Sequence, residues 1–345
     1  MSFEALSLPV LLAVFAGLAA LVTLCGVLLT GLADRLADQT GFGEALIGGV
    51  LLGATTSLSG VMVSITAAAD GRASLAFANS VGGIAAQTAF LAFADLAYRR
   101  VNLEHAAADL ANVFQAALLC LMLTLPILAF TVPGLEVFGL HPVTLALPVL
   151  YVLGVRATAA VRADPMWKPV QTAETREDTP DEPEAEDKSA LLPLILRIAA
   201  LGLVLAASGW AISRTGGALS GRIGLSETAV GALMTAVATS LPELVTTLAA
   251  ARRGAVQLAV GGIIGGNAFD VLFLTASDLA YTGGPFYEAL APGDLFWLAI
   301  GLSITAVLLL GLVLRQRAGP ARIGFESAAL LGLYGLGIAT QILRG

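Results

Sequence analysis

The sequence predicts an all-α polytopic membrane protein of about ten transmembrane helices, arranged as two inverted repeats of five helices. Composition, ten long apolar stretches and an internal repeat support this prediction. Of the 345 residues, 57% are hydrophobic and only 12% are charged, whereas soluble domains carry about 25% charged residues. The chain has too few charged groups to cover a water-exposed surface, which argues against a soluble domain.

Ten stretches are long and apolar enough to cross about 30 Å of hydrocarbon, which takes roughly 20 residues. Backbone groups in lipid must satisfy their own hydrogen bonds, so we expect each stretch to be a helix. The stretches cover residues 8–30, 46–69, 74–98, 108–131, 141–162, 190–213, 227–251, 255–281, 290–314 and 323–343.

The distribution of basic residues predicts the orientation, because cytoplasmic loops collect Lys and Arg. If both termini lie outside, the outside loops hold Arg72, Arg214, Arg222 and Arg344, and the inside loops hold the other fourteen of the eighteen Lys and Arg residues. We therefore expect a multi-pass protein of the cell (inner) membrane with both termini outside.

An acidic, proline-containing segment, Thr172–Asp187, interrupts the apolar pattern. Its composition predicts a disordered cytoplasmic linker over residues 164–189. The linker separates residues 1–163, with five predicted helices, from residues 190–345, with the other five.

The two halves are related in sequence. Gly41–Tyr98 aligns with Gly224–Tyr281 without a gap, and 20 of the 58 pairs are identical. We refer to this constant shift, from Gly41 to Gly224, as the repeat offset. Because each half has an odd number of helices, the second copy enters the membrane from the opposite side. Transporters built from such inverted repeats bind their substrate near the midplane, between the repeats.

One cluster of polar residues lies in the predicted helix 227–251. Glu243 is near the middle of this apolar span, where insertion scales give an acidic residue a cost of about 2.5–3.5 kcal/mol, so it is expected to be functional. Pro242 removes a backbone N–H and frees the carbonyl of Ala238. Thr239 and Ser240 add hydroxyl groups one turn away.

The next helix, 255–281, carries Asn267 and Asp270, which are three residues apart and share one helical face. Together with Glu243, Thr239 and Ser240 they form a set of oxygen ligands, which hard cations such as Ca²⁺ prefer. Soft ligands are missing from this set, which argues against copper or zinc.

These motifs carry a family resemblance. Thr239-Ser240-Leu241-Pro242-Glu243 followed by Gly265-Gly266-Asn267-Ala268-Phe269-Asp270 resembles the second α-repeat of the cation/calcium exchanger superfamily, which includes the sodium/calcium exchangers. The resemblance implies two inverted α-repeats, here at about 41–98 and 224–281, and a cytoplasmic loop between the halves. It also implies that Glu243 and Asp270 ligate the cation, with Thr239, Ser240 and Asn267 around them.

The first repeat departs from the family pattern at its acids. The positions equivalent to Pro242, Glu243 and Asp270 hold Ser59, Gly60 and Gln87. Asn79 resembles the family's asparagine, and Thr56, Ser57 and Gln87 remain as neutral oxygen donors. The candidate cation ligands are therefore Glu243, Asp270, Asn267, Thr239, Ser240, Thr56, Ser57, Asn79 and Gln87, with two carboxylates among them.

The remaining acids and the histidines have ordinary explanations. We expect Asp95 and Asp278, near helix ends, to cap helices or lie at the interface, and Asp109 and Asp294 to cap the helices that they begin. The two histidines, His105 and His141, are expected in solvated loops.

The sequence predicts a secondary active antiporter that exchanges Ca²⁺ or a related cation against Na⁺ or H⁺ by alternating access. The alternatives are a monovalent cation/proton antiporter on the same fold, in which Glu243 titrates during the cycle, and a non-transporting protein with a degenerate exchanger fold. Motifs for nucleophilic catalysis or phosphate binding are missing, so we expect neither enzymatic activity nor a cofactor. The expected partners are the transported cations and the lipid bilayer, not nucleic acid.

Overall fold

The computed structural model of the chain describes residues 3–40, 56–98, 100–175, 191–319 and 323–344. Within these ranges nine helices are long and apolar enough to cross a membrane. The remaining predicted span, 46–69, is described from Thr56 onward and includes the helix α3 (Leu58–Ala69). The fold class and the order of the predicted spans are confirmed, and the start of the first α-repeat, residues 41–55, lies outside the described residues.

The first half contains η1 (Phe3–Ala5), α1 (Leu8–Thr40), α3, α4 (Ala73–Tyr98), α5 (Leu103–Ala106), α6 (Leu110–Thr131) and α7 (Pro142–Ala163). The second half contains α8 (Leu191–Ile223), α9 (Glu227–Ala229), the π-helical turn η2 (Val230–Thr235), α10 (Ala236–Arg253), α11 (Val256–Asp270), α12 (Leu272–Ala280), η3 (Phe286–Ala289), α13 (Pro292–Leu314) and α14 (Phe325–Arg344). The repeat offset holds beyond the aligned segment, because it relates both ends of α1 to both ends of α8. It also relates the start of α7 to the start of α14.

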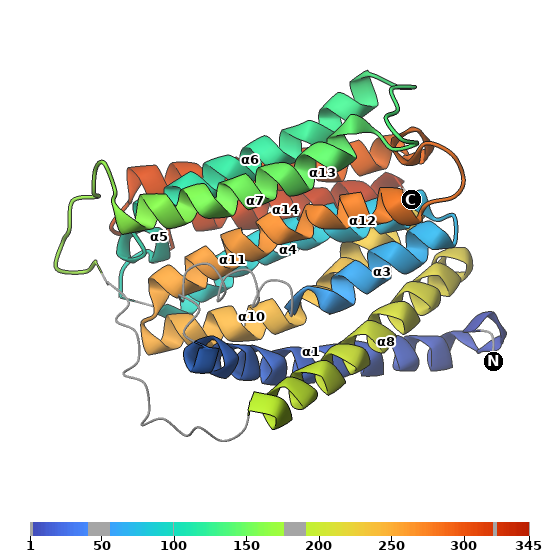
Figure 1. Cartoon of the computed structure of the whole chain (residues 1–345), viewed down its shortest axis with the longest axis horizontal. Helices are drawn as coiled ribbons and strands as arrows, with labels where there is room; N and C mark the ends of the chain where they lie inside the picture. The colour runs from blue at the N-terminus through green and yellow to red at the C-terminus, as the bar shows by residue number, and fades with distance from the viewer. Residues whose placement is uncertain (1–2, 41–55, 99, 176–190, 320–322, 345) are drawn as a thin grey trace.

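The helices differ in how deeply they are buried. Every residue in the most apolar part of α4 is buried, compared with 28% for α1 and 17% for α8. The long helices α1 and α8 lie side by side at one edge of the bundle, as Figure 1 shows. Leu192, Leu196 and Leu203 of α8 are exposed on its outer side, where lipid is the natural solvent. The structure therefore has a central helix and a peripheral pair.

The peripheral pair touches the rest of the protein at two equivalent glycines. A Cβ atom on Gly26 of α1 would lie 2.6 Å from the ring of Pro242 in α10. A Cβ atom on Gly209 of α8 would lie 2.3 Å from the backbone oxygen of Ser59 in α3. The repeat offset relates Gly26 to Gly209 and likewise Ser59 to Pro242. Small residues allow backbones to approach this closely in membrane helices.

Two equivalent aspartates tie the halves together at the ends of the bundle. Asp95 accepts hydrogen bonds from the backbone N–H of Leu103 and Gly324 and from the hydroxyl of Ser327. Asp278 accepts from the hydroxyl of Thr144 and the backbone N–H of His141. Thr144 and Ser327 are themselves equivalent under the repeat offset. The predicted capping role is confirmed, although the helix starts that the aspartates bond to, those of α5, α7 and α14, belong to other helices than their own.

The predicted capping by the other two acids is also confirmed. The side chain of Asp109 accepts from the N–H of Ala111 in the first turn of α6. Asp294 is fully buried and accepts from the N–H of Ala291, and it also accepts from the hydroxyls of Ser74 and Thr228. It therefore links the start of α13 to α4 and α9 as well.

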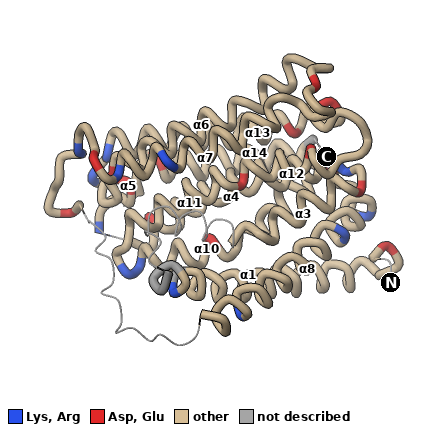
Figure 2. The backbone as a smooth tube through the Cα atoms, viewed as in Figure 1, with Lys and Arg blue, Asp and Glu red and all other residues tan. Residues whose placement is uncertain are grey.

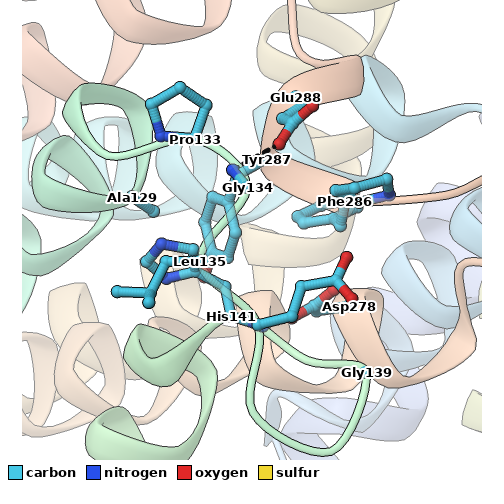
Figure 3. Close-up of a pocket in the computed structure, with 12 residues that line it drawn as sticks. Ala129, Pro133, Gly134, Leu135, Gly139, His141, Asp278, Phe286, Tyr287 and Glu288 are labelled. Atoms are coloured by element: carbon cyan, nitrogen blue, oxygen red, sulfur yellow. Dashed lines mark hydrogen bonds between the residues drawn. The ribbon is translucent and has the colours of Figure 1, made fainter.

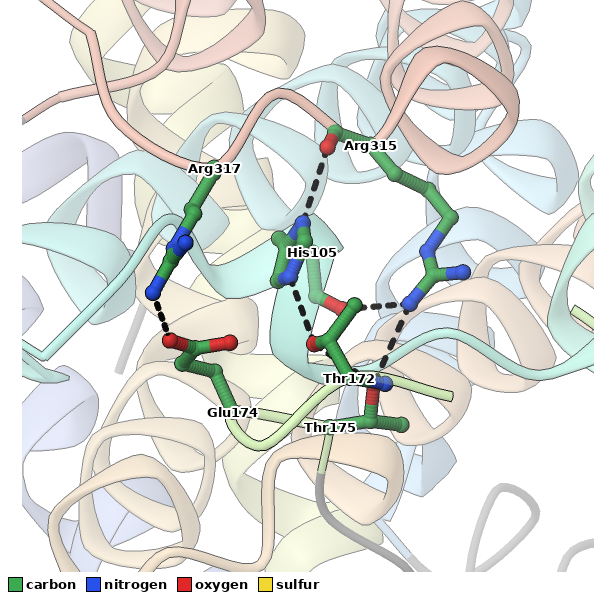
Figure 4. A network of polar contacts seen from close by, with 6 residues as sticks. All are labelled: His105, Thr172, Glu174, Thr175, Arg315 and Arg317. Carbon is green, nitrogen blue, oxygen red and sulfur yellow. Dashed lines mark hydrogen bonds and ion pairs between the residues drawn. The ribbon is translucent and has the colours of Figure 1, made fainter. Parts of the chain in front are cut away.

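The prediction of solvated histidines is wrong. His105 is buried, and its ring lies between the carbonyl of Arg315 and the hydroxyl of Thr172 (Figure 4). His141 is partly buried and caps the start of α7. Arg315 also donates to the carbonyl of Val170, and Arg317 pairs with Glu174. The described beginning of the acidic linker is thus bonded to α5 and to the end of α13, whereas residues 176–190 lie outside the described residues.

Candidate functional site

The two predicted acids lie where four helices of both halves meet. Glu243 lies in α10, directly after Pro242, and Asp270 is the last residue of α11, directly before the helix is interrupted at Val271. Helices α3 and α4 pack against α10, α11 and α12. Glu243 is 8% exposed and Asp270 is 2% exposed. The site is therefore a buried meeting point of the two repeats.

Asp270 is held by residues of the first repeat. The hydroxyl of Ser57 donates to Oδ1 at 2.6 Å, and the amide Nε2 of Gln87 donates to Oδ2 at 2.7 Å. The hydroxyl of Ser80 donates to the backbone oxygen of Asp270 at 2.7 Å. Hydrogen bonds to an ionised carboxylate are about twice as strong as neutral ones, so these contacts orient both carboxylate oxygens.

Glu243 has fewer partners. The hydroxyl of Thr56 donates to its carboxylate, and Asp270 is close enough for the two charges to interact. Its second oxygen, Oε2, is buried and has no hydrogen-bond partner in the described part of the chain. Two acids this close to each other repel strongly in a low-dielectric interior unless a cation or a proton lies between them.

Two buried amide oxygens of the predicted ligands also lack a hydrogen-bond partner in the described part of the chain. Asn267 donates through Nδ2 to the hydroxyl of Thr88, while its Oδ1 has no partner among the described residues. Gln87 donates through Nε2 to Ser240 as well as to Asp270, while its Oε1 has no described partner. Buried polar atoms are almost always hydrogen-bonded. Unpartnered acceptor oxygens beside two carboxylates are what a cation would bind.

The contacts across the site are reciprocal. Ser57 of the first repeat contacts Asp270 of the second, and Ser240 of the second contacts Gln87 of the first. The repeat offset relates Ser57 to Ser240 and Gln87 to Asp270. Two contacts that are exchanged in this way, each between equivalent residues of opposite halves, indicate a twofold relation between the halves. The site therefore lies on the pseudo-twofold axis between the halves.

Not every predicted ligand lies with the acids. Thr239 donates to the carbonyls of Thr235 and Ala236. Asn79 donates through Nδ2 to the carbonyl of Gly60 and the hydroxyl of Ser64, and accepts from Thr235. The structure thus bonds Ser57 and Gln87 to Asp270, Ser240 to Gln87 and Thr56 to Glu243, whereas the side chains of Thr239 and Asn79 bond to other groups than the two acids.

The sequence analysis missed several polar residues that support the site. Ser80, Thr88 and Thr235 bond to Asp270, Asn267 and Asn79, respectively. Their repeat equivalents are apolar: Ile263, Val271 and Leu52. The comparison of the repeats, which selected residues that recur, therefore gave no signal for them.

The charge of the site comes from two acids. Within the described ranges, no group of three or more His, Cys, Asp or Glu residues could hold a metal ion. A small pocket near Asp278 and Tyr287 (Figure 3) lies instead at the end of α12, between the loop before α7 and η3. A cation in the site would therefore be held by Glu243, Asp270 and neutral oxygens.

A bundle of two inverted repeats with a buried acid pair on their shared axis defines a membrane transporter of cations. The sequence matches the model of the family described as sodium/calcium exchanger protein over residues 10–155 and 192–343. The chain belongs to this family, and it is a cation exchanger and a multi-pass integral membrane protein. The predicted membership of the cation/calcium exchanger superfamily is thereby confirmed.

Solved structures show the same fold. The sodium-calcium exchanger NCX_Mj, soaked with 2.5 mM Na⁺ and 0.1 mM Sr²⁺, matches with a TM-score of 0.62 and 18% identity, over 97% of this chain and 99% of the other. The same exchanger soaked with 10 mM Na⁺ and 10 mM Sr²⁺ matches with a TM-score of 0.61 and 17% identity, over 96% and 99%. Among curated proteins, no sequence matches this chain.

Proposed function

We propose that the protein is a secondary active antiporter in which Glu243 and Asp270 bind the transported cation and its counter-ion in turn. The observation that carries this proposal is the buried acid pair, together with acceptor oxygens of Glu243, Gln87 and Asn267 that have no partner among the described residues. A membrane protein gains nothing in stability from such a group of atoms without a cation or proton, because desolvated carboxylates are costly.

The cation bound by the pair is Ca²⁺ or a related ion, and the counter-ion is Na⁺ or H⁺. Two carboxylates balance the charge of one divalent cation. Ca²⁺ accepts carboxylate and amide oxygens in flexible geometry, which Glu243, Asp270, Asn267 and Gln87 supply. The matched NCX_Mj structures were soaked with Na⁺ together with Sr²⁺ or Ca²⁺, which supports the same pair of ion types here.

Alternating access is provided by movement of α1 and α8 across the rest of the bundle. These helices are among the least buried spans in the described part of the chain. They contact the site helices at Gly26 and Gly209, next to Pro242 and Ser59. The two contacts are equivalent, so a movement of α1 and α8 that opens one contact and closes the other interchanges their geometries. Alternating access in inverted repeats requires such an interchange.

The proposed orientation places both termini outside the cell membrane and the linker in the cytoplasm. The start of α1 and the end of α14 lie at the same end of the bundle in Figure 1. Basic residues gather at the opposite end, around α5, in Figure 2. Arg315 is one of them, since it bonds to His105 of α5, and Arg317 pairs with Glu174 of the linker. Their position agrees with the positive-inside rule.

The experiment is a flux assay with the full chain in proteoliposomes. Ca²⁺, Na⁺, K⁺ and H⁺ are tested in pairs, with an imposed gradient of one ion driving uptake of the other. We expect gradient-driven cation uptake by the wild type and none by Glu243→Gln, which keeps the side-chain size but removes the charge. Unchanged flux in Glu243→Gln would contradict the site. Flux of no cation by the wild type, with stability indifferent to Glu243→Ala, would instead favour a non-transporting degenerate exchanger.

A second candidate is exchange of a monovalent cation against protons. It is favoured by Gln87, which stands at the position of a second aspartate and donates an N–H to Asp270. A neutral donor next to the acid lowers the attraction for a divalent ion more than for a monovalent one, since attraction scales with charge. Proton flux that depends on Na⁺ or K⁺, with no Ca²⁺ flux under the same conditions, would select this candidate.

A further inference from the structure

The first-repeat counterpart of Glu243 is Gly60, and the space beside it is filled. A Cβ atom on Gly60 would lie 2.7 Å from Cε2 and 3.1 Å from Cζ of Phe273. Cβ atoms essentially never approach another heavy atom to less than 3.0 Å. The aromatic ring of Phe273 therefore lies directly against the backbone of Gly60, where a carboxylate side chain would begin.

Packing holds the ring in this place. Phe273 belongs to α12 and is 3% exposed. Its ring lies edge-on to that of Phe269, with centroids 6.4 Å apart, and Phe269 in turn lies edge-on to Tyr151 of α7. Edge-to-face pairs of this kind stabilise aromatic packing beyond the effect of burial alone. A side chain on Gly60 has to displace this aromatic row.

An aromatic residue at this position is common to both halves. The counterpart of Phe273 is Phe90, and that of Gly60 is Glu243. The two halves therefore differ in the side chain at the position of Gly60. Because Gly60 has none, the ring of Phe273 lies against the backbone of α3. In the second half the equivalent position carries the Glu243 carboxylate.

The polar side chains that approach Gly60 from other helices have hydrogen-bond partners of their own. Thr239, whose Oγ1 lies 3.7 Å from the position of a Cβ on Gly60, donates to the carbonyls of its own helix. Asn79 uses both ends of its amide, and one of its bonds goes to the carbonyl of Gly60. On the Glu243 side, by contrast, Glu243, Gln87 and Asn267 each present an unpartnered oxygen.

We infer that Phe273 closes the first-repeat counterpart of the cation site, so that the protein binds one cation at a time, against Glu243 and Asp270. This inference rests on the proposed function. Phe273 is then the residue that sets how many cations the site holds. The two carboxylates that remain, on Glu243 and Asp270, then bind a single ion.

The first measurement is equilibrium binding of Ca²⁺ and of Na⁺ to the purified full-length wild type. We expect one cation per chain for whichever ion binds, and loss of that binding in Glu243→Gln. Two or more cations per chain, all lost in Glu243→Gln, would overturn the inference and leave the proposed function standing. Cation binding that is unchanged in Glu243→Gln would overturn the proposed function itself.

The second measurement reopens the closed side. Phe273→Ala combined with Gly60→Glu supplies both room and a carboxylate, and we expect Ca²⁺ binding to tighten about tenfold or more, or a second cation to bind. Phe273→Ala with Gly60→Gln is the neutral control of the same size, and it should bind as Phe273→Ala alone does. The full gain from Gly60→Glu with Phe273 in place, or no gain when Phe273→Ala and Gly60→Glu are combined in a folded protein, would contradict the role given to the ring. If the double variant does not fold, the wild-type count of bound cations still decides.

Discussion

In the second half of the chain, α10 and α11 carry Glu243 and Asp270, and at the equivalent places in the first half α3 and α4 carry Gly60 and Gln87. The frame around these positions is nevertheless reciprocal: serines cross from each half to the other, and glycines of α1 and α8 touch the helix turns just before the site. The comparison teaches that the residues shared by both repeats build the frame, whereas the charge belongs to one repeat only.

The largest loss of cation transport is expected at Asp270, the acid of the second half. Its equivalent in the first half is the amide Gln87. Asp270→Asn removes a charge that accepts from Ser57 and Gln87. Asparagine keeps one acceptor oxygen but loses one of the two negative charges that bind the cation, so cation binding and flux should fall by a factor of about 100 or more. The measurement is gradient-driven uptake in proteoliposomes.

Gln87→Asn provides the comparison, since it shortens the amide but changes no charge. We expect a loss of about tenfold or less, because one hydrogen bond to Asp270 is weakened while both carboxylates remain. Equal losses at Asp270 and Gln87 would mean that the two halves contribute alike, and the asymmetry of the site would have to be abandoned.

The next effect compares the aspartates at the two ends of the bundle. Asp95→Ala leaves three buried donors without a partner, and Asp278→Ala leaves two. Each orphaned donor costs about 1–3 kcal/mol, so Asp95→Ala should destabilise the protein by about 3 kcal/mol or more, and Asp278→Ala should do so by less. Thermal unfolding in detergent measures both. A larger loss at Asp278 would show that contacts other than these bonds decide the stability of the ends.

The pairs of equivalent residues in the two halves show which features the sequence could predict. The repeat offset, found in 41–98, established the equivalence of Ser57 with Ser240 and of Asp95 with Asp278. Helical periodicity and composition predicted the spans, because an apolar segment has only one stable conformation in lipid. The sequence analysis also predicted the acids as the centre of the site, because carboxylates are rare within membrane spans.

The contacts across the axis could not be predicted. A repeat shows which positions are equivalent, but not which side chains face each other, and the packing of Phe273 on Gly60 joins helices of opposite halves. Thr239 and Asn79 look like ligands in sequence, yet nearby carbonyls and hydroxyls satisfy them. The burial of His105 depends on Thr172 and on the carbonyl of Arg315, both far away in sequence.

A moderate effect on rate is expected at the glycines of the peripheral helices. Gly26→Val and Gly209→Val each place side-chain atoms against Pro242 and Ser59, so they should slow turnover about tenfold while the cation affinity changes little. Gly31→Val is a matched control in α1, because a Cβ at Gly31 meets no atom within 4 Å. If α1 and α8 move as proposed, both variants slow exchange; if only one does, the two halves do not move equivalently. Turnover and affinity are separated by measuring flux over a range of cation concentrations.

The smallest effect is a change in the pH dependence of stability, caused by an acid that is present at one end of the bundle, outside the membrane spans, and replaced at the other. Glu104 of α5 is fully buried, and its repeat counterpart is the neutral Tyr287. The carboxyl group of Glu104 lies against that of Glu326, and the two share a hydrogen bond. Burial, reinforced by the nearby charges of Glu326 and Asp95, raises the pKa of Glu104 well above its usual value. The folded protein therefore holds a proton on Glu104 up to a higher pH than the unfolded chain does.

The sign of the pH effect follows from this difference. Because the pKa of Glu104 is higher in the folded state, its contribution to stability is complete at acidic pH and is lost as the pH rises through the raised value. Glu104→Gln mimics the protonated acid, so it should flatten the fall in unfolding temperature towards alkaline pH. Glu136→Gln, at an exposed position of the opposite end, is the control and should leave the profile unchanged. A wild-type profile that rises with pH, or the same fall in Glu104→Gln, would show that Glu104 is charged in the fold and that its end of the bundle is built to hold that charge.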